Sequence, residues 1–222
     1  CKKEFIHKLV IPHGKRGFVI LEDGTKIWLN SGTQFIYPSA FGDNRRKVYL
    51  EGKAYFEVNK NKKKPFCVET SELDIEVLGT TFNVTSYGND KTIETVVVEG
   101  KVKVHKNGFH PFAENLFISP SQRVVYDKNQ KIIKTDRVDI NHFISWKEGY
   151  LYVQEKSLSS IVRQLSRIYN TKIILDKELR SLEFSGKLDL RDDLESELKI
   201  LAVSHPIQYS IKNNQVIINP KP

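Results

Sequence analysis

The sequence of 222 residues contains no methionine and only two cysteines. A natural chain begins with methionine, so we expect this sequence to be a piece of a longer protein. Two cysteines are too few for a disulfide framework. No apolar run approaches the roughly 18 residues of a membrane-spanning helix, and the first five residues lack the apolar region of a signal peptide. Cys1 is either an acylated lipoprotein cysteine or simply the first residue of the piece.

Motifs for catalysis and cofactor binding are also missing. The sequence has no phosphate-binding loop, no dinucleotide fingerprint and no Gly-x-Ser-x-Gly nucleophile motif, and no Cys/His spacing fits a zinc site. Asp189, Asp192 and Asp193 crowd together, but a helix N-terminus favours acidic residues through its exposed amides. We therefore expect no catalytic residue, no cofactor and no metal, and we do not expect an enzyme.

The net charge of +8 is concentrated in the first two thirds of the chain. Its clusters are Arg45-Arg46-Lys47 and Lys60 with Lys62-Lys63-Lys64. Such clusters either meet phosphates or anionic lipid, or lie in solvated loops. Because no helix presents these charges on one face, we interpret them as solvated loops and expect no nucleic-acid partner.

Short alternating apolar runs from Lys8 to about Asp139 predict an all-β domain, either a sandwich or a solenoid-like fold. Asp23-Gly24 between two apolar runs predicts a β-hairpin. Glu-Gly-Lys follows three apolar residues twice, at residues 48–53 and 96–101, and a glycine there marks a bulge or a close backbone approach. Cys67 is expected to be a small buried hydrophobe. The aromatic residues within the strand patterns are expected in the core: Trp28, Tyr37, Tyr55, Phe56, Phe66 and Phe82.

The pattern changes near Asn141. Apolar residues at helical spacing predict a helix over Ser157–Tyr169, with the Ser157 side chain capping its N-terminus. A second helix is expected over Asp192–Val203, capped by Asp192 or Asp193. With the intervening strands, the order is β-α-β-β-α-β-β, which indicates a small α+β domain with two helices on one face of a sheet. We therefore predict two domains, residues 1–143 and 144–222.

Several blocks of this sequence resemble the FecR family, the periplasmic part of transmembrane anti-sigma factors. The blocks are Leu21-Glu-Asp-Gly-Thr-Lys-Ile-Trp-Leu-Asn-Ser-Gly32, Tyr37-Pro38, Leu50-Glu-Gly-Lys-Ala-Tyr-Phe-Glu-Val58, Pro65-Phe66 and Val77-Leu-Gly-Thr-Thr-Phe-Asn-Val84. Lys53 stands where the family usually has glutamate. The tail, with Trp146-Lys-x-Gly149 and Phe184-Ser-Gly186, resembles the family's C-terminal domain, which is similar to the short signalling domain of secretins and TonB-dependent receptors.

The resemblance implies a protein with a cytoplasmic segment that holds an extracytoplasmic-function sigma factor. One inner-membrane helix would precede this chain, which would then lie in the periplasm. A ligand-loaded TonB-dependent outer-membrane receptor would present its signalling domain to it and so trigger release of the sigma factor. The cytoplasmic segment is absent from this sequence.

The run Leu182–Leu188 is a candidate edge strand, and such an edge can take an additional strand from a partner. We therefore expect the receptor to bind at Phe184, Ser185, Gly186, Lys187 and Leu188; the alternative is that Phe184 and Leu188 are simply core residues. A carbohydrate-binding β module is the second function considered. An enzyme acting on glycans ranks third, because the spacing of Glu57, Glu69, Asp74 and Glu76 neither supports nor excludes paired carboxylates.

Overall fold

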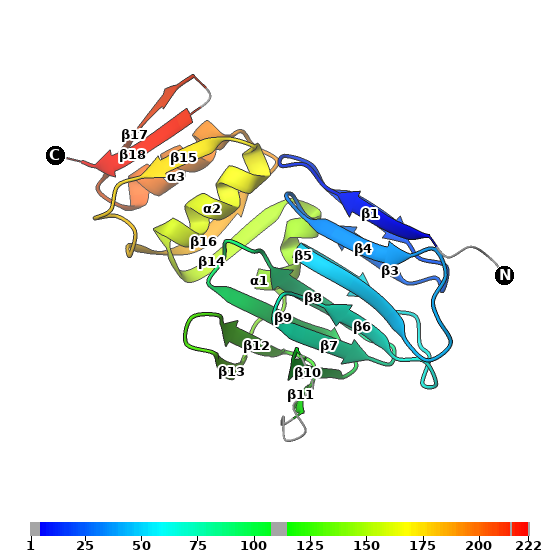
Figure 1. Ribbon diagram of the computed structural model, residues 1–222. Coiled ribbons are helices and arrows are strands. Elements are labelled where there is room, and N and C mark those ends of the chain that lie inside the picture. Colours follow the sequence, from blue (N-terminus) through cyan, green and yellow to red (C-terminus); the bar gives the residue numbers. More distant parts are fainter. Residues whose placement is uncertain (1–4, 108–114, 214, 222) are drawn as a thin grey trace. The chain divides into compact units, whose positions relative to one another are not determined.

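The computed structural model describes residues 5–107, 115–213 and 215–221, so Cys1 lies outside the described residues. The chain divides into two compact units, Cys1–Ile140 and Asn141–Pro222 (Figure 1). Within the described ranges, no helix has both the length and the apolar character needed to cross a membrane. Strands dominate the first unit, and strands alternate with helices in the second, as the sequence predicted.

The strands of the first unit form one large curled sheet. Its strands are β1 (Ile6–Val10), β2 (Gly17–Ile20), β3 (Lys26–Leu29), β4 (Gln34–Pro38), β5 (Arg46–Glu57), β6 (Phe66–Glu69), β7 (Leu73–Val77), β8 (Thr81–Ser86), β9 (Thr92–Glu99), β10 (Val102–Lys106), β11 (Leu116–Ile118), β12 (Gln122–Asp127) and β13 (Ile132–Arg137). The main path runs β11-β10-β7-β6-β5-β8-β9-β12-β13, and the pairs β1-β4 and β2-β3 join it at β5. The predicted hairpin at Asp23-Gly24 is confirmed as the connection between β2 and β3.

The long strand β5 belongs to both layers of this curled sheet. Its first residues, from Arg46 to Glu51, pair with β6 and β4. Its last residues, from Gly52 to Glu57, pair with β8, and β3 pairs along Ala54–Glu57. Apolar side chains from both layers form one core, so the first unit has the two-layered arrangement of a sandwich.

Glycine is required where the chain passes from one layer to the other. Gly52 in β5 has φ +135°, and a Cβ atom there would lie 2.6 Å from the Cα of Thr33. Gly79 lies between β7 and β8 with φ +146°, and its Cβ would lie 2.6 Å from the Cα of Lys60. Both positions combine left-handed backbone with a close approach that leaves no room for a side chain.

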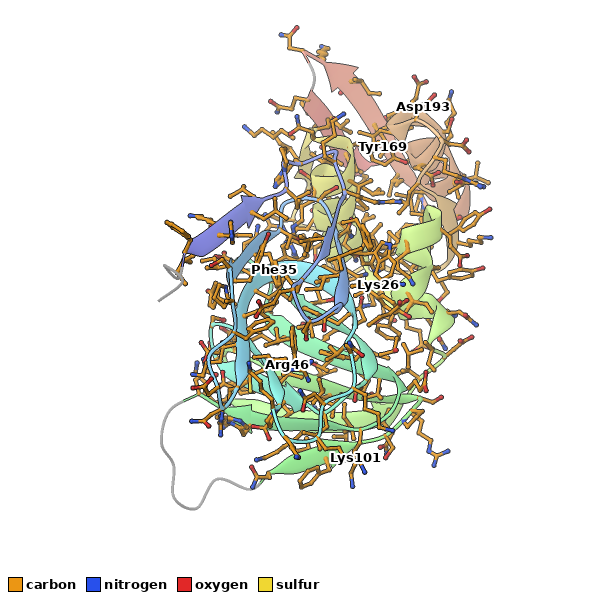
Figure 2. All side chains as sticks on the ribbon, turned by 90° about the vertical axis from the view of Figure 1, so that its right-hand side faces the viewer. Lys26, Phe35, Arg46, Lys101, Tyr169 and Asp193 are labelled. Carbon is orange, nitrogen blue, oxygen red and sulfur yellow. The ribbon has the colours of Figure 1, made fainter. Side chains whose placement is uncertain are left out.

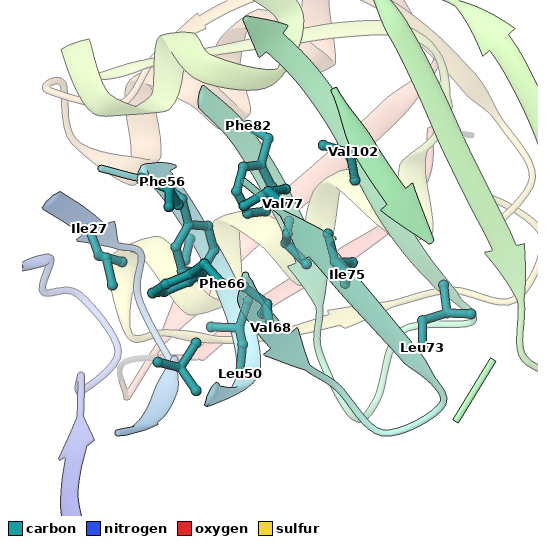
Figure 3. Packing of buried hydrophobic residues seen from close by; sticks show 14 of the residues in the cluster. Ile27, Leu50, Phe56, Phe66, Val68, Leu73, Ile75, Val77, Phe82 and Val102 are labelled. Atoms are coloured by element: carbon teal, nitrogen blue, oxygen red, sulfur yellow. The ribbon is translucent and has the colours of Figure 1, made fainter. Parts of the chain in front are cut away.

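Three phenylalanines at the centre of the core come from three different strands (Figure 3). The rings of Phe56 and Phe82 stack with centroids 4.9 Å apart, and the rings of Phe56 and Phe66 meet edge to face at 6.2 Å. All three side chains are fully buried. Burial of such rings contributes strongly to stability, both through apolar area and through ring geometry.

The prediction that all six strand aromatics are core residues was partly wrong. Trp28 alternates with the core residues Ile27 and Leu29, so it lies on the opposite face of β3, where its ring packs 5.6 Å from that of Tyr55. Tyr55 is also on the opposite face of β5 from Phe56, but it is buried, as predicted. The alternation of a strand shows which residues share a face, but an aromatic ring is compatible with either face.

Arg46 is buried, which corrects its interpretation as part of a solvated cluster. Its side chain is 2% exposed, and its guanidinium forms an ion pair with Asp23, at 2.6 Å between Nη1 and Oδ2. Figure 2 labels Arg46 in the first unit. Nη1 also donates to the carbonyl of Asn59 at 2.8 Å, and Nε donates to that of Lys64 at 2.8 Å. Its guanidinium carbon lies 5.4 Å from the centroid of the Phe66 ring. A buried charge requires such partners, and those of Arg46 come from the β2–β3 hairpin, the loop between β5 and β6, and β6 itself.

Cys67 is buried as predicted, with a free thiol, but it lies outside the main core. It alternates with Phe66 and Val68, so it faces away from the core, and its sulfur lies 4.0 Å from a carboxylate oxygen of Glu76. Burial, reinforced by the negative charge of Glu76, raises the pKa of the Cys67 thiol to about 11. The thiol is therefore protonated and unreactive at neutral pH.

The second unit has its strands in two small sheets, not the single sheet that we expected. Its elements are α1 (Asn141–Ile144), a 3-10 turn η1 (Ser145–Glu148), β14 (Tyr150–Ser157), α2 (Leu158–Tyr169), β15 (Lys172–Leu175), β16 (Glu183–Asp189), α3 (Leu194–Ser204), β17 (Ile207–Lys212) and β18 (Gln215–Pro220). One sheet is β14-β16, and the other is β15-β18-β17. Helix α2 lies against both β14 and β15, so both sheets share one apolar core with the helices.

The two helix N-termini differ from each other. Ser157 precedes α2, but its side chain makes no capping hydrogen bond, contrary to the prediction. Instead, the amide of Leu158 donates to the carbonyl of Leu182 at 2.6 Å, so a neighbouring segment supplies the acceptor. Asp193 caps α3 as predicted, because its Oδ1 accepts from the amide of Ser196 at 2.8 Å.

Glu197 on α3 is fully buried in the second unit. Neither of its carboxylate oxygens has a hydrogen-bond partner among the described residues. Loss of hydration, with a smaller effect of Asp189, Asp192 and Asp193, raises the pKa of Glu197 from 4.5 to about 7. The protonated carboxyl is therefore the form that the fold prefers.

We predict that the two adjacent arginines differ sharply in their contribution to stability. Arg46→Ala leaves Asp23 without its buried partner and is expected to lower the free energy of unfolding by about 3–5 kcal/mol. Arg45 is exposed and lies 3.7 Å from Glu76, so Arg45→Ala is expected to cost no more than about 1 kcal/mol. Denaturant unfolding followed by circular dichroism measures both, and equal losses would contradict the role assigned to Arg46.

We also predict that stability falls as pH rises, through Glu197. A carboxyl whose pKa is higher in the folded state stabilises the fold below its unfolded pKa, and this contribution is lost as pH rises to about 7. We compare the free energy of unfolding of Glu197→Gln with that of the unmodified chain at two pH values. The gain in the variant is expected to be larger at pH 8 than at pH 4, by up to about 3 kcal/mol. Glu195→Gln, on the exposed side of the same helix, is the control and is expected to give no such difference.

Candidate partner-binding strand

The five residues expected to bind a partner, Phe184, Ser185, Gly186, Lys187 and Leu188, all lie on β16. This strand pairs with β14 along one side, and within the described residues no strand pairs with its other side. Strand β14 also lies against α1, η1 and α2, while the outer strands β15 and β17 each lie against a helix. The free side of β16 is therefore an unpaired strand edge of the second unit.

The side chains of Phe184 and Leu188 point into the core. They are 5% and 3% exposed, and the Phe184 ring lies 4.0 Å from the ring of His205. Of the two alternatives, the core position is thus the one observed for these side chains. They hold β16 in place, and a partner would reach these two residues chiefly through the backbone of the strand.

The backbone of β16 directs alternate residues toward its open side. The amide of Leu190 donates to the carbonyl of Gly149 at 2.7 Å, which marks these two residues as a hydrogen-bonded pair. Such pairs alternate along an antiparallel ladder, so Leu188 and Gly186 direct their polar groups toward β14. We infer that Lys187 and Ser185 direct theirs toward the open side, where an additional strand would find donors and acceptors.

Gly186 has no structural reason to be glycine within the described chain. Its φ is not in the left-handed region, and a Cβ atom there would meet nothing within 4 Å. Glycine in a strand weakens the sheet, because it adds backbone entropy and buries no side chain. The position that a Cβ atom of Gly186 would occupy is therefore open.

The outward face of the β14-β16 sheet combines aromatic and basic side chains. The Lys187 amine lies 3.6 Å from the centroid of the Tyr150 ring and 5.3 Å from that of Tyr152. Arg191 donates to the Tyr150 hydroxyl at 2.6 Å and lies over the same ring, with its guanidinium carbon 4.4 Å from the centroid. Hydrogen bonds from Arg191 lower the pKa of Asp189 to about 2. Cation–π contacts hold these side chains in one arrangement.

Tyr150, Tyr152 and Arg191 were not among the predicted binding residues. The alternation Tyr150-Leu-Tyr-Val153 was a usable signal, because Leu151 and Val153 are buried in the core and the tyrosines therefore face outward. Their contact with Lys187 was not visible in the sequence, because the two strands are more than thirty residues apart. Ser185 was predicted, and its hydroxyl accepts from the amide of Glu155 at 2.9 Å, which fixes a bulge in β14.

Three of the four carboxylates considered for an enzyme lie within 4 Å of a basic side chain in the first unit. Glu69 accepts from Lys47 at 2.8 Å, and Glu76 lies 3.7 Å from Arg45. Asp74 lies 3.9 Å from His105. Glu57 is in the part of β5 that pairs with β3 and β8, so it belongs to the other layer. The positions of Glu69, Asp74 and Glu76 are those of charge pairs along neighbouring strands.

Two family models match this chain. The model described as FecR protein matches residues 7–103, and the model described as FecR, C-terminal, matches residues 150–218. No curated protein matches the chain.

Two crystal structures of a candidate anti-sigma factor from Parabacteroides distasonis ATCC 8503 share the fold. Each is 29% identical to this chain in sequence, with TM-scores of 0.90 and 0.91. The matches cover 97% and 98% of this chain and 100% of the other. Since models of one family match both of its units, and its fold extends over the whole of that anti-sigma factor, the chain belongs to the FecR family of anti-sigma factors.

Proposed function

We propose that this chain is the periplasmic sensing part of a transmembrane anti-sigma factor. FecR-family proteins are membrane-anchored and act on sigma factors. In this proposal, the signalling domain of a TonB-dependent outer-membrane receptor adds a strand to β16. The signal passes inward and releases an extracytoplasmic-function sigma factor from a cytoplasmic segment of the same protein.

The observation that carries this proposal is the unpaired side of β16. Ser185 and Lys187 direct backbone donors and acceptors toward it, and Gly186 between them adds no side chain. Strand addition obtains its affinity from main-chain hydrogen bonds and its specificity from neighbouring side chains. Here those side chains are Lys187 and Arg191, which favour a partner strand with acidic residues on its outward face.

The first test is to mix this chain with the signalling domains of the TonB-dependent receptors of its organism and to measure binding by calorimetry. We expect a one-to-one complex of about micromolar affinity with one of them, as is usual for a small signalling interface. No binding across the set, with the chain folded, would instead favour the carbohydrate-binding module, which retention on glycan affinity gels would then test.

Lys187→Pro and Lys187→Ala distinguish strand addition from a simple charge contact. Proline removes an amide on the open side of β16 while the ladder to β14 keeps its hydrogen bonds, so we expect at least ten-fold weaker binding. Alanine keeps the amide and is expected to weaken binding only a few-fold. Equal losses in the two variants would show that the charge of Lys187, and not the backbone, makes the contact.

Hydrogen exchange supplies a second measurement on the unmodified chain. If a strand is added to β16, the amides of Ser185 and Lys187 exchange more slowly in the complex, while those of the outer strand β17 are unchanged. Protection confined to another strand would move the binding surface away from β16.

A further inference from the structure

The two basic clusters of the sequence differ in the structure. In the first cluster, Arg46 is buried against Asp23. Its neighbours Lys47 and Arg45 form ion pairs with acidic residues on the next strands. The first cluster is therefore neutralised by its own chain.

The second cluster keeps its charge. The Lys64 amine donates to the carbonyl of Phe41 at 3.2 Å. Lys60, Lys62 and Lys63 are exposed, and no ion pair or side-chain hydrogen bond holds them within the described residues. Three neighbouring ammonium groups that repel one another in the free protein are a surface prepared for negative charge.

Two further turns meet this loop at one end of the first unit. The amide of Asn61 donates to the carbonyl of Leu78 at 2.8 Å, and the backbone of Lys60 closely approaches Gly79. The hydroxyl of Thr80 donates to the carbonyl of Lys101 at 3.0 Å. The loop with the three lysines, the turn at Gly79 and the turn at Lys101 are therefore contiguous.

Two large apolar side chains are exposed in this region, Leu78 next to the loop with the three lysines and Phe117 beside Lys101. Leu78 is 43% exposed and Phe117 is 54% exposed, and the Lys101 amine lies 4.9 Å from the centroid of the Phe117 ring. We call the set Lys60, Lys62, Lys63, Lys101, Leu78 and Phe117 the lysine corner; Figure 2 labels Lys101 within it. Glu99, two residues before Lys101, is an exposed carboxylate next to it.

We propose that the lysine corner binds the surface of an anionic lipid bilayer. Lysine ammonium groups act as point charges toward scattered headgroup phosphates, whereas specific binding of nucleic acid favours arginine forks and stacked rings. Exposed leucine and phenylalanine side chains enter the interfacial region of a bilayer. Both kinds of group are present in the corner, which fits a lipid surface better than a polyanion in solution.

The attachment is weak by itself. Each lysine near an anionic surface raises the membrane partition coefficient about five-fold. Such binding matters most for a protein that is already tethered at the membrane, as FecR-family proteins are. In that setting the lysine corner would orient the first unit against the bilayer, independently of any partner at β16.

Vesicle sedimentation with the whole chain tests the proposal. The probes are vesicles of phosphatidylcholine alone and of phosphatidylcholine with an equal part of phosphatidylglycerol. We expect binding to the anionic vesicles only, with an affinity that falls as salt concentration rises. Equal binding to both kinds of vesicle, or to neither, would overturn the proposal.

Two charge-matched variants locate the surface. Lys60, Lys62, Lys63 and Lys101 are replaced by glutamine in one variant, and the exposed lysines Lys8, Lys15, Lys91 and Lys134 in the other. We expect at least ten-fold weaker binding in the first and a change of less than about three-fold in the second. Similar losses in both would show that net charge alone attracts the chain, and would overturn the assignment to the corner.

Phe117→Ser tests whether the Phe117 side chain enters the bilayer or the lysines alone attract the chain to it. We expect it to weaken binding to anionic vesicles several-fold and to make the remaining binding more sensitive to salt. Tighter binding of the unmodified chain to heparin or duplex DNA than to the vesicles, lost with the same four lysines, would identify a polyanion as the ligand and contradict the proposal. All variants are at exposed positions, and circular dichroism confirms that each is folded before binding is measured.

Discussion

The buried ion pair between Arg46 and Asp23 connects the parts of the first unit. Arg46 begins β5, the strand shared by both layers, and Asp23 lies in the hairpin between β2 and β3. The same carboxylate accepts from the Thr25 hydroxyl at 2.8 Å, and the Asn59 side chain donates to the carbonyl of Asp23 at 2.6 Å. Separating a buried charge from its partner costs several kcal/mol of stability. This network therefore fixes the positions of the hairpin, of β5 and of the loop that follows it.

The network also explains why the Asp-Gly-Thr block of the sequence has its composition. Asp23 supplies the carboxylate, Gly24 provides the left-handed turn with φ +83°, and Thr25 orients the carboxylate through its hydroxyl. A hairpin alone needs only the turn residues. The requirement for Asp and Thr comes from Arg46, which is more than twenty residues away. The motif therefore has the sequence of a local turn, but two of its residues serve a long-range contact.

The sequence predicted those features of the structure that depend on neighbouring residues, and it failed for features that depend on distant segments. Alternation located the strands, and helical spacing located α2 and α3, because both follow from backbone periodicity. The burial of Arg46, the face of β3 on which Trp28 lies and the acceptor at the start of α2 all depend on distant segments, and the sequence predicted each of them wrongly. For β16 the sequence correctly grouped Phe184 with Leu188, but periodicity does not say whether their shared face is a core or a binding surface.

The second unit combines a well-packed core with two features that reduce its stability. One is the open side of β16, and the other is the buried carboxyl of Glu197. The two features are close in the sequence, because α3, which carries Glu197 and is capped by Asp193, is the next element after β16. A domain selected only for stability would cover the open side of β16 and would have an apolar residue in place of Glu197. An added strand would satisfy the open backbone of β16, and the free energy of that contact would be available to hold the partner. In the function that we propose, a strand of a second chain would complete this edge.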